Sequence, residues 1–198
     1  MKYLKIIVIF IFLINNQVNG QEKKLTKEER LEWFQDAKLG IFIHWGYYGV
    51  KGIGESWSMY HKQISYEDYM SQGNKLTAAN YDPEIWVKLF KKVGARYAVL
   101  TTKHHDGVAL WDTKLSKLNV KEKTPAKRDL VQPYVNALRN EGLKVGLYYS
   151  LCDWSHPDYD VVFPRPNTKK DYPQTGQKNL SKWQRFVKFY KGQLKELS

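Results

Sequence analysis

Three short apolar runs that alternate with stretches of helical periodicity constrain the fold of this chain more than any other feature. The runs lie at residues 39–45, 97–102 and 144–149. Strands that alternate with helices pair in parallel, and fully apolar strands belong to sheets that are covered on both faces. The pattern therefore predicts an α/β fold whose parallel sheet is covered on both sides.

Two capped helices connect these runs. Asp82, followed by Pro83, marks the start of the first helix and Gly94 its end, whereas Asp129 and Gly142 bound the second. These residue types cap and terminate helices, because a carboxylate accepts from first-turn N–H groups and glycine adopts the left-handed backbone that ends a helix. A later amphipathic helix carries an apolar stripe made of Trp183, Phe186, Val187, Tyr190 and Leu197. The chain thus holds three predicted β/α units.

The connections before and after the strands differ in length. Only Ala95 and Arg96 separate the first helix from the second strand, whereas residues 47–81 follow the first strand as one long connection. Long loops after the strands are typical of a TIM-like (β/α)8 barrel, whose working face lies at the carboxyl ends of its strands. Because a closed barrel needs eight units, the sequence predicts that this chain supplies only the first few β/α units.

The first twenty residues have the pattern of a signal peptide. Lys2 and Lys5 precede an apolar stretch at residues 6–14, which is too short to span a bilayer. Cleavage after residue 20 would leave a mature chain of residues 21–198 without a membrane segment. The sequence therefore predicts a secreted or periplasmic protein.

The chain is basic, with a formal net charge of +12. A basic surface can indicate nucleic-acid binding, which would show a steep dependence on salt concentration. The lysines are, however, scattered over predicted helix faces and loops, and no nucleic-acid motif accompanies them. We therefore expect a solvated lysine-rich surface and no nucleic-acid partner.

Polar side chains follow each predicted strand. His44 ends the first strand, His104 and His105 end the second, and residues 148–150, which are two tyrosines and a serine, end the third. Because the carboxyl ends of parallel strands meet at one edge of a sheet, these side chains should share one site. A sugar would fit it, since Trp45 offers a flat apolar face beside hydrogen-bonding groups.

The residue chemistry leaves two kinds of enzyme open. A zinc ion held by His44, His104 and Asp106 would indicate a metal-dependent barrel hydrolase. Paired carboxylates would indicate a glycosidase instead, and the acids nearest the expected site are Glu55, Asp106 and Asp153. Metal ligands on one strand are normally two residues apart, whereas the second strand ends in adjacent histidines. This objection weakens if the strand ends before the histidines, so both kinds of enzyme stay open on the residues alone. Our expectation is a site without a metal or cofactor.

Five motifs of this chain resemble those of the α-L-fucosidases of glycoside hydrolase family 29. The resemblance extends over residues 31–198 and keeps the order and spacing of the motifs. The motifs are AKLGIFIHWG at 37–46, DPEIW at 82–86, LTTKHHDG at 100–107, RDL at 128–130 and GLKVGLYYS at 142–150. Several matches in sequence order are far more specific than any single short motif.

The resemblance implies a (β/α)8 catalytic barrel that removes terminal α-L-fucose from glycans with retention, and residues 21–198 would form the N-terminal portion of that barrel. It implies that the histidines bond the fucose hydroxyls, and that a tyrosine and an acidic–aromatic pair line the pocket. The residues carried over are His44, Glu55, Trp57, His104, His105 and Tyr149. One departure is that Ser56 separates the acid from the tryptophan, where many members have the two adjacent.

The resemblance also implies that both catalytic carboxylates follow Ser198. Retaining hydrolysis needs two carboxylates about 5 Å apart. We therefore expect this chain alone to be inactive, with a non-catalytic fucose-binding remnant as the alternative.

Overall fold

The computed structural model describes residues 26–159 and 180–198, so the predicted signal peptide lies outside the described residues. The chain divides into two compact units, Met1–Asp36 and Ala37–Ser198. In the first unit the described residues form most of helix α1 (Lys27–Ala37), which begins with a reciprocal capping box. Within the described ranges, no helix is both long and apolar enough to cross a membrane.

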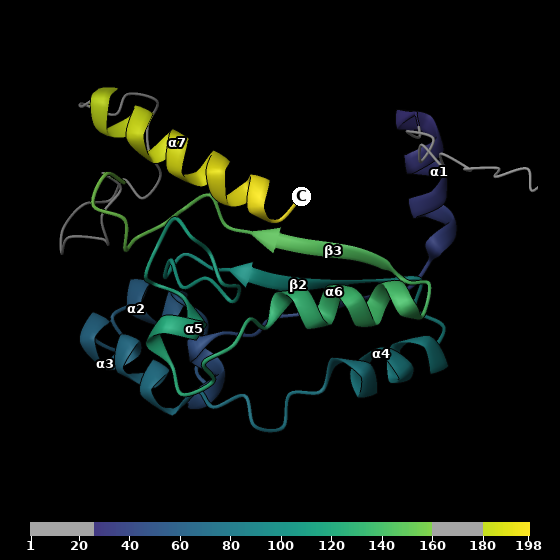
Figure 1. Ribbon diagram of the computed structural model, residues 1–198, viewed down its shortest axis with the longest axis horizontal. Coiled ribbons are helices and arrows are strands. Elements are labelled where there is room, and N and C mark those ends of the chain that lie inside the picture. The colour runs from purple at the N-terminus through teal and green to yellow at the C-terminus, as the bar shows by residue number, and fades with distance from the viewer. Residues whose placement is uncertain (1–25, 160–179) are drawn as a thin grey trace, which may run out of the picture. The chain divides into compact units, whose positions relative to one another are not determined.

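The second unit is built on a parallel three-stranded sheet (Figure 1). Its strands are β1 (Gly40–Ile43), β2 (Tyr97–Lys103) and β3 (Lys144–Tyr149), and they lie side by side in sequence order. All three predicted strands are present, and the predicted α/β class with a parallel sheet is confirmed.

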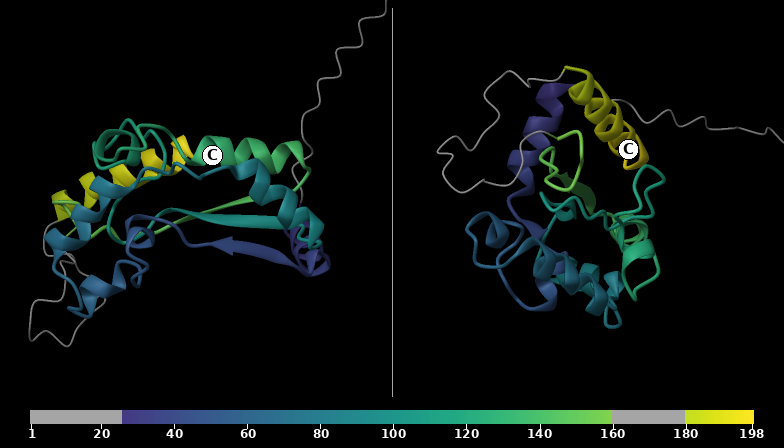
Figure 2. Two further views of the ribbon diagram at one scale, coloured as in Figure 1. Left: turned by 90° about the horizontal axis from the view of Figure 1, so that it is seen from below. Right: turned by 90° about the vertical axis from the view of Figure 1, so that its left-hand side faces the viewer.

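Three longer helices lie over one face of this sheet (Figure 2). They are α4 (Pro83–Lys92), α6 (Val131–Asn140) and α7 (Leu180–Glu196). The carboxylates of Asp82 and Asp129 accept hydrogen bonds of 2.7 to 3.2 Å from first-turn N–H groups of α4 and α6. The predicted caps are thus confirmed.

The two faces of the sheet have different surroundings. Ala98 and Leu100 of β2 are fully buried in the apolar core that the sheet shares with its helices. On the opposite face, Phe42 of β1 is 53% exposed, because no helix of the described part of this unit covers that side. The prediction that both faces are covered is therefore wrong for the described residues.

Short helical turns gather near the carboxyl ends of the strands (Figure 1). They are η1 (Tyr47–Val50), α2 (Trp57–Tyr60), α3 (Tyr66–Ser71), η2 (Gln72–Lys75) and α5 (Val120–Lys123). Most fall within the connection expected to be irregular. Single turns are too short to show apolar periodicity, and local bonds such as the Ser65 cap on the N–H of Asp68 define them instead.

Candidate functional site

Three histidines lie together at the carboxyl edge of the sheet, and we call them the histidine cluster: His44, His104 and His105. The rings of His104 and His105 are 4.4 Å apart, and those of His44 and His104 are 6.0 Å apart. Neighbouring residues on a strand point to opposite faces, but β2 ends at Lys103. The two adjacent rings can therefore lie side by side beyond the strand end.

The segment at residues 55–57, which leads into α2, contacts all three members of the histidine cluster. The Glu55 carboxylate lies 3.3 Å from Nδ1 of His44, and the Ser56 hydroxyl lies 2.5 Å from Nδ1 of His104. The Trp57 ring meets the His105 ring edge to face, with 5.2 Å between the ring centres. Glu55 and Trp57 are thus brought to the cluster, and the intervening Ser56 contacts it as well.

A second loop, which follows β3, completes the surroundings of His105. Nδ1 of His105 lies 2.5 Å from the Ser150 hydroxyl, which in turn donates to the Cys152 carbonyl at 3.0 Å. The Trp154 ring lies 4.9 Å from the imidazole. His105 therefore has a polar group at Nδ1 and aromatic rings from two different segments.

Of the two tyrosines at the end of β3, Tyr148 lies beside the histidine cluster. Its ring lies 6.2 Å from that of His44 and 6.1 Å from that of His104. Tyr149, expected at the site, lies elsewhere and donates its hydroxyl to Gln193 of α7 at 2.8 Å. The two tyrosines are adjacent on β3, so their side chains point to opposite faces and only one can reach the cluster. We correct the assignment accordingly.

The Trp45 ring packs against Tyr81 at 4.9 Å and Trp86 at 5.8 Å. Trp45 and His44 both line a cleft of about 540 Å³. The tryptophan rings that contact His105 are those of Trp57 and Trp154.

Burial sets the charge state of two of the histidines. It lowers the pKa of His104 to about 3, and the neighbouring histidines contribute to this shift. Burial also lowers the pKa of His105. Both rings are therefore neutral at pH 7, and a neutral imidazole carries one donor and one acceptor nitrogen. Such rings suit a ligand rich in hydroxyl groups.

The three candidate acids lie in different environments. Glu55 contacts the histidine cluster, as described above. The Asp106 carboxylate accepts from the Tyr69 hydroxyl at 2.5 Å, and burial raises its pKa to about 6. Asp153 accepts from Lys103 at 2.8 Å in a fully buried ion pair. Two of the three acids thus have protein partners away from the histidine rings.

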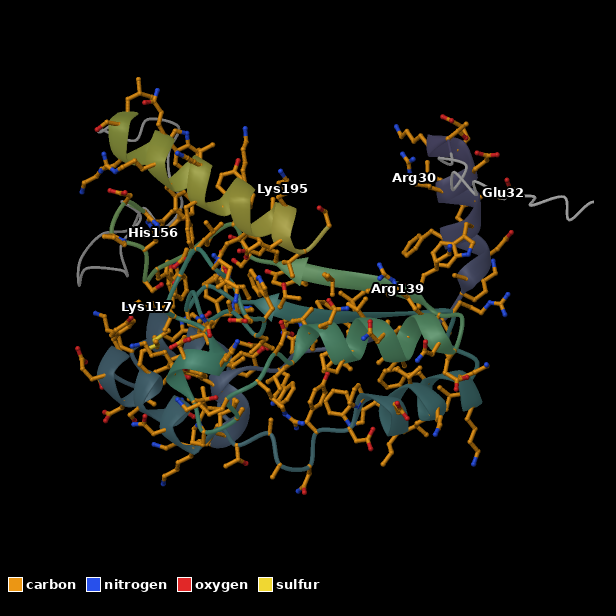
Figure 3. All side chains as sticks on the ribbon, in the orientation of Figure 1. Arg30, Glu32, Lys117, Arg139, His156 and Lys195 are labelled. Carbon is orange, nitrogen blue, oxygen red and sulfur yellow. The ribbon has the colours of Figure 1, made fainter. Side chains whose placement is uncertain are left out.

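The described residues hold no group of three or more His, Cys, Asp or Glu side chains that could bind a metal ion. The combination of His44, His104 and Asp106 is therefore not assembled as a ligand set. A further histidine, His156, packs against Phe186 and Phe189 of α7 (Figure 3).

Comparison with known proteins gives the family. The sequence profile described as Alpha-L-fucosidase matches residues 13–198. The tissue alpha-L-fucosidase of Bos taurus is 39% identical over 143 residues, which are 64% of this chain and 30% of the relative. That of Macaca fascicularis is 36% identical over 181 residues, which are 82% of this chain and 37% of the relative. This chain belongs to the alpha-L-fucosidase family and spans about a third of the length of these relatives.

Solved structures agree with that assignment. Alpha-L-fucosidase isoenzyme 1 from Paenibacillus thiaminolyticus is 44% identical, with a TM-score of 0.72 over 86% of this chain and 40% of its own. A GH29 alpha-L-fucosidase from Bacteroides thetaiotaomicron, trapped as a covalent intermediate with 2-fluoro-fucosyl fluoride, is 33% identical. Its TM-score is 0.68, over 83% of this chain and 37% of its own.

Proposed function

We propose that this chain provides the sugar-binding part of a retaining α-L-fucosidase that acts on terminal α-L-fucose of glycans. One observation carries the proposal: the histidine cluster comes from two adjacent strands, and each ring has a residue of the segment 55–57 against it. Family membership supports the choice of fucose among hydroxyl-rich ligands.

The arrangement suits a small sugar. The neutral rings of His104 and His105 can each accept one hydroxyl proton or donate to one hydroxyl oxygen. Trp57 and Trp154 add aromatic surface for the apolar parts of the sugar, which include the methyl group of fucose. Binding in this proposal uses no metal or cofactor.

The chemistry in this proposal needs groups outside the described residues. Retaining hydrolysis uses a nucleophile and an acid/base about 5 Å apart. Asp106 is bonded to Tyr69, and Asp153 is paired with Lys103. We assign both catalytic roles to the part of the family's length that this chain does not span. The covalent intermediate trapped in one related structure is what a retaining mechanism produces.

The proposal also includes a (β/α)8 barrel as the architecture and a secreted or periplasmic location. A parallel sheet in the sequential order β1-β2-β3 is what the first units of a (β/α)8 barrel would give, and its uncovered face would then line the barrel interior. The signal-peptide pattern at residues 1–20 supports a secreted or periplasmic location.

Calorimetric titration of the chain with L-fucose tests this function. We expect saturable binding that weakens at least about tenfold in His44→Gln, because removal of a direct polar contact typically costs about 1.5 kcal/mol. His44 is 38% exposed, so the substitution should leave the fold intact. His156→Gln is the matched control, since His156 packs against α7. Equal fucose affinity in the two variants would contradict the proposal.

Hydrolysis of an aryl α-L-fucoside, measured on the same preparations, separates binding from catalysis. The proposal predicts binding without turnover by residues 21–198. Turnover at a rate comparable to full-length relatives would overturn the assignment of both carboxylates to the part of the family that this chain does not span.

A further inference from the structure

All three Nδ1 atoms of the histidine cluster face a polar group of the protein. These groups lie 2.5 to 3.3 Å from the Nδ1 atoms: the Glu55 carboxylate at His44, the Ser56 hydroxyl at His104 and the Ser150 hydroxyl at His105. A ligand that enters the site therefore meets the Nε2 atoms. Whether such an atom donates or accepts depends on which ring nitrogen carries the proton, and the partner of Nδ1 decides this.

For His105 the groups around Nδ1 favour one direction of the hydrogen bond. The Cys152 carbonyl can only accept, and it lies 3.0 Å from the Ser150 hydroxyl and also forms a backbone hydrogen bond with the His105 ring. The Tyr148 hydroxyl is a further neighbour of Ser150. With its proton directed to the carbonyl, the Ser150 oxygen accepts from Nδ1–H of His105, 2.5 Å away. We infer that Ser150 is a positioning residue that holds neutral His105 as the Nδ1–H tautomer, so that Nε2 accepts a hydrogen bond from a ligand hydroxyl.

The main chain at His105 is held without this hydroxyl. The N–H of Ser150 donates to the Lys103 carbonyl at 3.0 Å, and the N–H of Trp154 donates to the His105 carbonyl at 2.8 Å. These two backbone bonds bracket the histidine on both sides and remain when the serine side chain is shortened. The hydroxyl of Ser150 therefore selects the tautomer, whereas the backbone fixes the position.

Ser56 gives an informative contrast. Within the described residues its hydroxyl is bonded only to Nδ1 of His104, so it can either donate or accept there. The carbonyl of Cys152 removes that freedom from Ser150, which is 3% exposed and so has little access to water as a substitute partner. Of the two serines, only Ser150 has a carbonyl beside it that can take its proton.

The consequence concerns ligand selectivity. An unprotonated Nε2 requires a donor, so His105 accepts a hydroxyl group and disfavours an ether, fluoro or carbonyl group at the same place. That this hydroxyl belongs to fucose rests on the proposed function, whereas the tautomer itself does not.

The first test measures the tautomer directly. Long-range 1H–15N correlation spectra of the 15N-labelled chain at pH 7 distinguish protonated from unprotonated ring nitrogens, and loss of the signals in His105→Gln assigns them. We expect a protonated Nδ1 and an unprotonated Nε2 for His105. A protonated Nε2 would overturn the inference, whatever the chain binds.

The second test uses Ser150→Ala. We expect the His105 signals to shift toward a mixture of tautomers and the L-fucose affinity to fall about fivefold to tenfold, as for loss of one hydrogen bond. Thr124→Val is the matched control, because it also removes a buried hydroxyl that donates to a carbonyl, here that of Val120 in α5. An unchanged His105 tautomer in Ser150→Ala would contradict the role of Ser150.

Deoxy sugars make the second test specific. The analogues are 2-, 3- and 4-deoxy-L-fucose. The analogue that lacks the hydroxyl bound by His105 should bind wild type and Ser150→Ala equally, because Ser150 acts through the hydrogen bond that this analogue cannot form. Equal losses for all three analogues would show a general structural effect and would overturn the inference. Failure of every sugar to bind, with the expected tautomer present, would count against the proposed function alone.

Discussion

His44 and His105 belong to the same cluster, yet they are held very differently. His105 follows the central strand β2, is bracketed by backbone bonds and lies next to the buried pair of Lys103 and Asp153. His44 follows the edge strand β1, and its side chain has one polar partner among the described residues, Glu55. Both side chains are more than a third exposed. The β2–β3 part of the site is therefore built into the core, whereas the β1 part lies at the surface.

The largest effect should come from breaking the ion pair that supports the buried part. Lys103→Met leaves the Asp153 carboxylate buried without its partner, and removal of one member of a buried pair costs about 3–5 kcal/mol. Urea denaturation measures the loss. Lys114→Met is the control, because its pair with Asp112 is exposed and should contribute less than about 1 kcal/mol.

A restoration experiment sharpens this prediction. The double variant Lys103→Met with Asp153→Leu removes both charges and should regain part of the lost stability. If Lys103→Met lowers the free energy of unfolding as little as Lys114→Met does, the buried ion pair does not stabilise the β2–β3 part of the site more than an exposed pair would.

A smaller effect should appear as pH dependence at Asp106. Burial raises the pKa of Asp106 to about 6, above the ordinary aspartate value of 3.8. Folding therefore favours the protonated form, so this group stabilises the protein most below about pH 4 and its contribution is lost as the pH rises through 6. The difference between wild type and Asp106→Asn should change by about 3 kcal/mol over that window. Denaturation at pH 4, 5, 6 and 7 measures it, and a constant difference would contradict the raised pKa.

The smallest effect is expected at the exposed part of the site. Glu55→Gln weakens a contact with His44 that is open to solvent, so the free energy of unfolding should change by less than about 1 kcal/mol. Thermal unfolding in low salt measures this change. A loss as large as that of Lys103→Met would remove the distinction between the two parts.

The three strands and helices α4, α6 and α7 were predictable, because each depends on local chemistry. Apolar runs define the strands, Asp82 and Asp129 cap the helices, and the histidines stand where the strands end. The exposed position of Phe42 was not predictable, because it depends on what lies over the sheet rather than on β1 itself.

The finer details of the site depend on geometry that the sequence does not contain. Two adjacent tyrosines end β3, and the pairing of β2 with β3 shifts by one residue between Thr101 and Lys103. The regular register already pairs Tyr148 with Thr101, and the shift moves Tyr149 from Thr102 to Lys103. The Tyr148 ring lies 6.1 Å from that of His104. The role of Ser56 has a sequence signal, since it lies between Glu55 and Trp57, but its bond to His104 joins residues far apart in the chain.

The central claim is that residues from two strands and their loops form one fucose site. Titration of the 15N-labelled chain with L-fucose, followed by the ring signals of His44, His104 and His105, tests it most directly. We predict that all three sets of signals shift together with one dissociation constant, while the His156 signals stay fixed. Shifts at His156 alone, or no shift in any ring at saturating sugar, would contradict the account.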